Sequence, residues 1–270
     1  MTTETDIAAL WDRRDSVTEN DLRGRVLVTD VIDRLDRGEL RVAEVTESGD
    51  VVVHEWVRQA ILLSFRLLPV EEAAAGPFAY RDRIPVKTTF DGVRVVPGAV
   101  ARWGSYCAPG VVLMPSFVNI GGYVGADSMV DTWATVGSCA QIGQRVHLSG
   151  GVGIGGVLEP PNAVPVIVED DAFVGSRSMV VDGARVRRGA KLGAGCILTA
   201  STRVFDAETG EELPRGEAPE RAVCVGSTRV RSFPGGDFGM PCLLVLRYLD
   251  GTEHDKLALN DVLRRHGVAQ

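Results

Sequence analysis

The feature that most constrains this chain is a six-residue repeat of apolar side chains through its middle. Ten apolar or aromatic positions run from Val100 to Ile154, and seven more run from Val168 to Val204 in a shifted phase. A period of six suits neither a 3.6-residue helix nor a long two-residue strand alternation, and it predicts a β-solenoid with one large inward residue on each side. The two runs are Val100, Tyr106, Val112, Val118, Val124, Val130, Val136, Ile142, Leu148 and Ile154, and then Val168, Val174, Val180, Val186, Leu192, Leu198 and Val204.

Two segments interrupt or leave the repeat. Fourteen residues separate Ile154 from Val168, and prolines 160, 161 and 165 lie between them. Proline cannot donate to a strand ladder, so residues 157–166 are predicted to leave the wall as a loop insertion. The charged, proline-containing segment 205–220 is predicted to be a surface excursion.

The repeat divides the chain into three predicted parts. Residues 1–92 are expected to form an N-terminal helical domain with a β-hairpin, residues 93–230 the solenoid, and residues 231–270 a C-terminal strand and helix cap. Periodicity in the first part predicts helices over 6–13, 20–37 and 55–67, a hairpin of strands 41–45 and 51–54, and a polar connector over 70–93. A cap is expected because a solenoid has open ends.

Composition excludes several classes of protein. The formal net charge of −7 argues against a nucleic-acid binder that depends on a basic surface. No apolar stretch approaches the ~20 residues of a membrane span. The five cysteines are scattered without metal-ligand spacing, which favours reduced thiols and no metal site. A cytoplasmic protein is therefore expected.

A few polar side chains stand where a ligand can reach them. Asp131 follows the inward position Val130, so its carboxylate and the nearby Trp133 ring are expected to face outwards. His147 is the one histidine within the repeat, and Arg94 enters the first coil. An arginine fork suits a carboxylate, although each of these side chains is also compatible with a solvated surface. The glycines of 150–156 are predicted to form coil corners rather than a dinucleotide loop, because no βαβ unit surrounds them.

Longer strings of residues carry a resemblance. They include Arg94-Val95-Val96-Pro97, Leu113-Met114-Pro115-Ser116, the block from Met129 to Ala140, and the block from His147 to Pro160. On these residues the chain resembles the tetrahydrodipicolinate N-succinyltransferase family over nearly its whole length. The resemblance implies a mainly β fold, a left-handed parallel β-helix of hexapeptide repeats, assembled as a homotrimer with active sites in grooves between neighbouring β-helices.

The resemblance also implies a reaction in lysine and diaminopimelate biosynthesis. Members transfer succinyl from succinyl-CoA to the amino group of ring-opened tetrahydrodipicolinate, a small amino dicarboxylate, without a metal. Arg94 is then expected to hold an acceptor carboxylate, and Asp131 to be catalytic and to bind the amino nitrogen. Trp133 and Glu159 complete the implied substrate site, and the acyl-CoA groove is lined by Gly150, Gly153, Gly156, Ser176 and Ala194.

One departure from the family pattern keeps alternatives open. Family members carry a glutamate after an Arg-Ser dipeptide, whereas Arg177-Ser178 is followed here by Met179. The first alternative is an acyltransferase diverted to a specialised pathway, of the tabtoxin-biosynthesis kind, that uses acetyl-CoA or a modified amino dicarboxylate. The second is a non-catalytic β-helix scaffold, against which the presence of Arg94, Asp131 and the glycine-rich segment argues.

Overall fold

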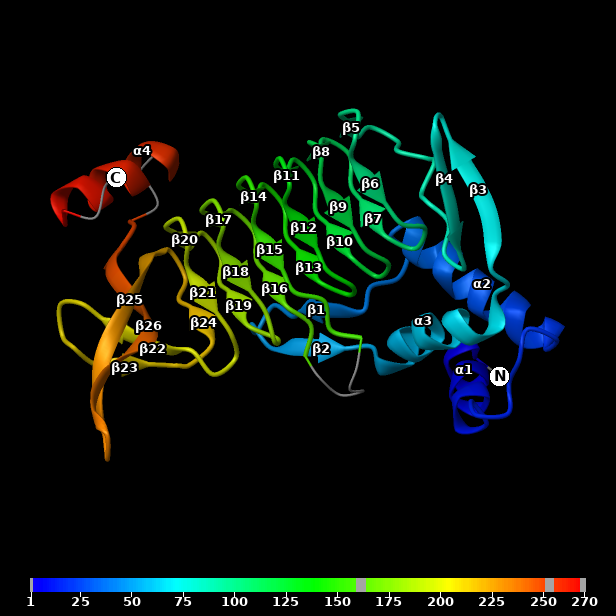
Figure 1. Ribbon diagram of the computed structural model, residues 1–270, viewed down its shortest axis with the longest axis horizontal. Helices are drawn as coiled ribbons and strands as arrows, with labels where there is room; N and C mark the ends of the chain where they lie inside the picture. Colours follow the sequence, from blue (N-terminus) through cyan, green and yellow to red (C-terminus); the bar gives the residue numbers. More distant parts are fainter. Residues whose placement is uncertain (1, 159–163, 251–254, 268–270) are drawn as a thin grey trace.

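A parallel β-helix forms the middle of the molecule, with helices at one end and a long hairpin and a helix at the other (Figure 1). The computed structural model describes residues 2–158, 164–250 and 255–267. The two chain termini lie at opposite ends of the β-helix. The predicted mainly β class, a left-handed parallel β-helix of hexapeptide repeats, is confirmed.

Two-residue strands stack in parallel register into three sheets, which we number in chain order. Sheet 1 contains β5 (Arg94–Val95), β8 (Val112–Leu113), β11 (Met129–Val130), β14 (His147–Leu148), β17 (Phe173–Val174) and β20 (Lys191–Leu192). Sheet 2 contains β6 (Val100–Ala101), β9 (Phe117–Val118), β12 (Thr135–Val136), β15 (Gly153–Ile154), β18 (Met179–Val180) and β21 (Ile197–Leu198). Sheet 3 contains β7 (Tyr106–Cys107), β10 (Tyr123–Val124), β13 (Gln141–Ile142), β16 (Ile167–Val168), β19 (Arg185–Val186) and β24 (Glu217–Ala218).

The core of the β-helix confirms the repeat from Val118 onwards but corrects its first three positions. Every predicted inward residue from Val118 to Val204 is buried. Before Val118 the phase was wrong by one residue, because Val100, Tyr106 and Val112 face outwards and are only partly buried. Their inward neighbours are Ala101, Cys107 and Leu113. Since Leu113 and Val118 are both inward, the side that holds Pro115 is one residue shorter than the others.

Three helices make a second core against the first coils. They are α1 (Thr3–Asp12), α2 (Leu22–Asp36) and α3 (Glu55–Leu67), and the last of these coincides with its predicted bounds. The Asp21 carboxylate begins α2 by accepting a hydrogen bond from the Gly24 amide at 2.8 Å, a normal N-cap. Ile120 and Cys139 of the coil pack into this helical core, so the N-terminal part is joined to the β-helix by apolar contacts.

The N-terminal hairpin covers the outer surface of sheet 3. It consists of β1 (Ala43–Val45) and β2 (Val51–Val53), paired antiparallel. Beside it, Arg41 stacks on the Tyr123 ring at 3.8 Å and donates to Gln141 Oε1 at 3.0 Å. Further along, Arg185 donates to the Gly49 carbonyl at 2.9 Å. Sheet 3 is therefore the covered side of the β-helix.

The segment predicted as a connector, residues 70–93, contains a hairpin that the sequence pattern did not indicate. β3 (Glu71–Ala75) pairs antiparallel with β4 (Phe78–Asp82) across a turn at Gly76, whose φ is +60°. The strands lack an alternation of apolar and polar residues because the described side chains of both are exposed. A strand with no buried side has no periodic signal.

The C-terminal part differs from its predicted outline. Within 205–220, β22 (Arg203–Asp206) pairs with β23 (Glu212–Leu213), and β24 then returns to sheet 3, so the excursion is not wholly outside the coil. β25 (Ala222–Phe233) runs past the boundary predicted at residue 230 and forms a long hairpin with β26 (Gly236–Tyr248). β25 also extends sheet 1 by pairing in parallel with β20. The helix α4 (Asp255–Arg265) packs against the hairpin through Leu259 and Val262.

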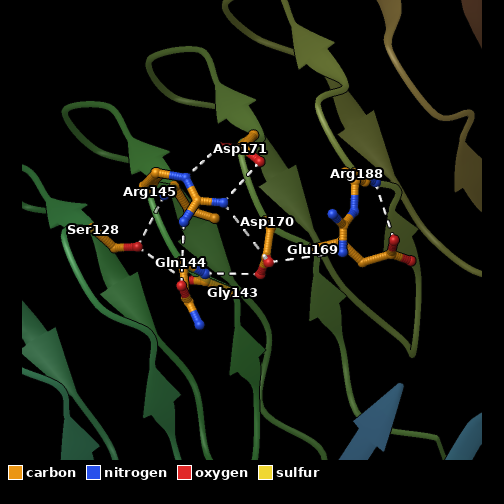
Figure 2. Close-up of polar contacts among 9 residues, drawn as sticks. Ser128, Gly143, Gln144, Arg145, Glu169, Asp170, Asp171 and Arg188 are labelled. Atoms are coloured by element: carbon orange, nitrogen blue, oxygen red, sulfur yellow. Dashed lines mark hydrogen bonds and ion pairs between the residues drawn. The ribbon is translucent and has the colours of Figure 1, made fainter. Parts of the chain in front are cut away.

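Charged side chains link successive coils at the corner between sheets 3 and 1 (Figure 2). Arg145 donates to both carboxylate oxygens of Asp171, at 2.6 and 3.0 Å. Asp170 accepts from the Gln144 amide at 2.9 Å, and Glu169 accepts from the Arg188 amide at 3.1 Å. The hydrogen bond from Arg145 is the main reason that the pKa of Asp171 lies below its usual value. This corner therefore stabilises the stacking of the coils electrostatically.

We predict that Arg145→Gln lowers the free energy of unfolding at pH 7 by no more than about 1 kcal/mol, because the pair is exposed to solvent. A carboxyl whose folded-state pKa is depressed stabilises the fold above its unfolded value of about 3.9 and loses that effect as pH falls. Urea unfolding of both proteins at pH 7 and in acid will therefore give a difference that shrinks in acid. An undiminished difference in acid would contradict this account.

Candidate active site

Arg94 and Asp131 lie on the same side of the β-helix. Arg94 pairs in register with Val112, and Val112 pairs with Met129, two residues before Asp131. Two strand spacings put the Cα atoms of Arg94 and Met129 roughly 10 Å apart. The Arg94 side chain is exposed and that of Asp131 is 31% exposed. Both charged groups therefore border the outer surface of sheet 1.

The Asp131 carboxylate is held by its own turn. Its Oδ1 accepts a hydrogen bond from the Thr132 amide at 2.6 Å and another from the Thr132 hydroxyl at 3.2 Å. Its Oδ2 lies 3.9 Å from His147 Nε2. Thr132 was not among the residues singled out in the sequence, and the signal available was its position directly after the aspartate, within reach of that carboxylate. One oxygen is thus fixed and the other faces the imidazole.

The next residues form a corner between sheets 1 and 2, which we call the sheet 1/2 corner (residues 131–134, 149–152, 175–178 and 193–196). Three predicted cofactor residues, Gly150, Ser176 and Ala194, occupy one position of it in successive coils. The Gly150 carbonyl accepts from the Arg177 amide at 3.0 Å, and the Ser176 carbonyl accepts from the Gly195 amide at 2.9 Å. The fold therefore brings these three residues into one column.

Trp133 occupies the next position of this corner, which Gly151, Arg177 and Gly195 occupy in the later coils. Its side chain is 75% exposed, and its φ of +61° lies in the left-handed region that non-glycine residues seldom adopt. The same conformation recurs at Gly151, Arg177 and Gly195, with φ of +70°, +59° and +73°. The corner itself requires this backbone turn, and at Trp133 it directs a large apolar ring into solvent.

Gly153 lies beyond this corner, on the outer surface of sheet 2, where it pairs with Met179. A Cβ on Gly153 would meet the Met179 sulfur at 2.5 Å, so the methionine side chain lies across the glycine. Met179 in turn pairs with Ile197, and their side chains are 42% and 58% exposed. The surface beside the sheet 1/2 corner is consequently apolar and open to solvent.

Two predicted site residues are not placed with the others. Gly156 lies past β15 near the corner between sheets 2 and 3, where the Val157 amide donates to the Ser138 carbonyl at 3.0 Å. It is therefore on a different edge of the β-helix from Gly150, Ser176 and Ala194. Glu159 lies outside the described residues.

A pocket of 850 Å³ opens beside the sheet 1/2 corner. From the coil, Ser176, Ala194 and Ile197 line it; from outside the coil, residues 226–228 of β25, Pro241 of β26 and Leu263 of α4 complete it. The sequence had assigned Pro241 and Leu263 only a capping role, and residues 226–228 to the solenoid. The structure shows that they also wall a cavity next to two predicted cofactor residues.

The cysteines are buried rather than assembled as a site. All five are free thiols, and burial raises the pKa of Cys107 and of Cys139 to about 12. Within the described part of the chain no group of three His, Cys, Asp or Glu side chains is placed to hold a metal ion. Among the described helices, none has the length and apolar character needed to cross a membrane.

Comparisons with known proteins give a consistent picture. The family model described as "Tetrahydrodipicolinate N-succinyltransferase N-terminal" matches residues 2–67, and "Hexapeptide repeat of succinyl-transferase" matches residues 165–200. The chain is 45% identical over 285 residues to a 2,3,4,5-tetrahydropyridine-2,6-dicarboxylate N-succinyltransferase of Chelativorans sp., which covers 96% of this chain and 99% of the relative. A protein with the same name from Acinetobacter baylyi is 47% identical, with 89% of each chain covered.

Similarity to solved structures is weaker. A putative 2,3,4,5-tetrahydropyridine-2-carboxylate N-succinyltransferase from Campylobacter jejuni aligns at 14% identity with a TM-score of 0.42. The alignment covers 81% of this chain and 62% of that chain. Family membership is therefore drawn from the sequence relatives.

We predict that the thiols of the native protein react slowly with Ellman's reagent at pH 8. The reactive species is the thiolate, and pKa values of about 12 at Cys107 and Cys139 leave very little of it. In denaturant, all five thiols will react rapidly. Rapid stoichiometric labelling of the native protein would show that the buried thiols are accessible.

Proposed function

The chain belongs to the tetrahydrodipicolinate N-succinyltransferase family, and from that premise we propose that it transfers succinyl from succinyl-CoA to ring-opened tetrahydrodipicolinate. Such an N-acyltransferase acts in lysine and diaminopimelate biosynthesis. One observation supports placing the reaction on the outer surface of sheet 1. Arg94 and Asp131 lie on this side of the β-helix, beside the column of Gly150, Ser176 and Ala194. In this proposal the acceptor site adjoins that column of residues.

The chemistry joins an amine to a thioester carbonyl. Arg94 holds an acceptor carboxylate through paired charge-assisted hydrogen bonds, which fixes the distance from carboxylate to amine. Asp131 accepts a hydrogen bond from the amino nitrogen, orients its lone pair towards the carbonyl carbon, and takes up the proton that the nitrogen loses before that proton passes to the CoA sulfur. The C–N bond forms, the C–S bond breaks, and CoA leaves with a proton. Positioning of this kind supplies a large share of the rate enhancement in acyl transfer.

The thioester is proposed to lie along the sheet 1/2 corner. Gly150, Ser176 and Ala194 place backbone groups beside a chain of pantetheine length, and the 850 Å³ pocket at the end of the column accommodates its far end. Gly153 leaves a side-chain gap on sheet 2 that Met179 partly fills. A backbone amide along this corner is proposed to stabilise the oxyanion of the tetrahedral intermediate.

The active assembly is proposed to be a homotrimer in the cytoplasm. Sheet 3 is already covered by the N-terminal hairpin, whereas the sheet 1/2 corner and sheet 2 expose Trp133, Met179 and Ile197 to solvent. Exposed apolar side chains of this size favour contact with another protein surface. A second copy laid against this side encloses the groove and excludes water from the thioester.

We predict that Asp131→Asn lowers kcat by about 10²- to 10⁴-fold, the range expected when a group that handles a proton is lost. The measurement is CoA release from succinyl-CoA in the presence of the cyclic acceptor. Asp182→Asn is the matched control, since Asp182 is an exposed aspartate at a corner between sheets 2 and 3. Full activity of the Asp131 variant would refute its role.

A diverted acyltransferase is the second candidate function, and exposed Met179 beside Gly153 is the observation that favours it. With succinyl-CoA as donor, we expect the wild type to exceed its own rate with acetyl-CoA by at least about tenfold, a difference of about 1.4 kcal/mol. Turnover with acetyl-CoA alone would instead support the second candidate. In that case Met179→Glu should raise succinyl transfer, whereas Met179→Leu, which keeps the site apolar, should not.

A further inference from the structure

We propose that the cavity between the β3–β4 hairpin and the first coils binds a small organic cation, a protonated amine with an apolar body. The cavity has a volume of 350 Å³, which is within the usual size range of sites for small molecules. Because it lies on the outer surface of sheet 2, whereas Asp131 borders sheet 1, the inference does not rest on the proposed acyl transfer. We call it the hairpin pocket, and its walls include Glu71, Ala73 and Tyr80 of the hairpin, Ile84, and Val100 and Phe117 of the coil.

The hairpin is fixed to the coil at its root. The Trp103 amide donates to the Pro85 carbonyl at 2.9 Å, and Arg102 Nη2 donates to Asp82 Oδ2 at 2.7 Å. Among the described residues, no hydrogen bond joins positions 71–81 to the coil. The two strands stand beside β6 at the start of the β-helix (Figure 1), and the hairpin pocket occupies the space between them and sheet 2.

Strand pairing decides which side chains of the hairpin face the pocket. Glu71 pairs directly with Asp82 in this antiparallel hairpin. Ala73 pairs with Tyr80 in the same way, and directly opposed residues of an antiparallel pair share a face. Since the Asp82 side chain reaches Arg102 of the coil, this is the face that is turned towards the coil. Tyr80 lies on it and is nevertheless 40% exposed, so the cavity leaves its ring accessible to a ligand.

This face of the hairpin carries one uncompensated charge, that of Glu71. The two arginines that border the pocket are already engaged, because Arg102 donates to Asp82 and Arg83 donates to Glu19 Oε1 at 2.5 Å. Within the described part of the chain, the Glu71 carboxylate has no hydrogen-bond or ion-pair partner. A carboxylate of this kind at the edge of a cavity attracts cations and repels anions.

The remaining walls suit an amine with an apolar body. Tyr80 lies diagonally across the hairpin from Glu71, a separation of roughly 7–8 Å. An ammonium group between them donates to the carboxylate and is attracted by the negative face of the ring. The outward side chains of Val100 and Phe117 are partly buried and offer the rest of the ligand an apolar surface. A carboxylate on the ligand would lie against this surface, which favours a simple amine over an amino acid.

A bound amine would also join the hairpin to the coil. A two-stranded hairpin is marginally stable by itself, and the described side chains of β3 and β4 are exposed. A ligand that contacts Tyr80 on one side and Phe117 on the other supplies apolar contacts between the two parts. We therefore expect binding to slow amide hydrogen exchange across residues 71–82.

The test titrates the full chain with hexylammonium, hexanol and hexanoate, which share the same hexyl chain and differ in charge. Ligand-observed NMR gives the Kd of each. We expect hexylammonium to bind in the millimolar range, as is usual for a molecule of this size. Hexanol should bind at least about fivefold more weakly, because it lacks the ion pair with Glu71. Hexanoate should bind more weakly still.

A pair of neighbouring glutamates provides the matched variants. Glu71→Gln should weaken hexylammonium binding at least about fivefold and remove the difference between hexylammonium and hexanol. Glu72→Gln is the control, since Glu72 pairs with Arg81 and strand alternation puts its side chain on the opposite face of the hairpin. It should bind hexylammonium as the wild type does. Tyr80→Leu, which keeps an apolar side chain but removes the ring, should also weaken binding.

The outcomes separate this inference from the proposed function. No saturable binding of hexylammonium, equally tight binding of hexanoate, or an unchanged Kd in Glu71→Gln would each overturn it. Displacement of hexylammonium by succinyl-CoA would assign the amine to the acyl-transfer surface and overturn it as well. Binding with the expected charge preference, lost in Glu71→Gln and kept in Glu72→Gln, supports the hairpin pocket whether or not the protein transfers succinyl.

Discussion

The structure depends on one constraint, the register of stacked coils. Each short strand pairs in parallel with the strand one coil before and one coil after it, so every backbone position recurs at a spacing of about 4.8 Å. The inward apolar residues then form a continuous column, and the corner residues form continuous edges. Because two residues per side are enough for a strand, the chain turns every few residues, and some corner side chains, such as Trp133, reach the surface while others, such as Ala134, stay buried.

That register explains why the candidate site is linear rather than a closed cavity within one coil. Residues at equivalent positions come from coils 18 to 26 residues apart, as with Gly150, Ser176 and Ala194. The site therefore extends along the β-helix, a form that suits a long thioester better than a compact ligand. Its proposed acceptor end lies where Asp131 meets His147, and its far end is walled by β25, β26 and α4.

The charged side chains at the corner between sheets 3 and 1 and those around Asp131 have different roles. At the corner between sheets 3 and 1, acids and arginines pair with one another, as in Arg145 and Asp171 (Figure 2). Around the sheet 1/2 corner, the Asp131 carboxylate contacts an imidazole across 3.9 Å and a threonine, and no described arginine or lysine forms an ion pair with it. Satisfied charge pairs stabilise a fold, whereas a carboxylate that keeps one oxygen available is suited to bind a substrate.

The sequence alone determined the architecture and most inward residues, because a six-residue period is a local property that needs no knowledge of distant contacts. Helix α3, and the two helices and the hairpin that precede it, were also predictable, because they too show a local periodicity of apolar residues. Only the tertiary structure decided the phase before Val118, since a one-residue shortening near Pro115 is invisible without the partner strands. It likewise decided that Asp131 meets His147 and that Gly156 lies on another edge, because proximity between coils depends on register.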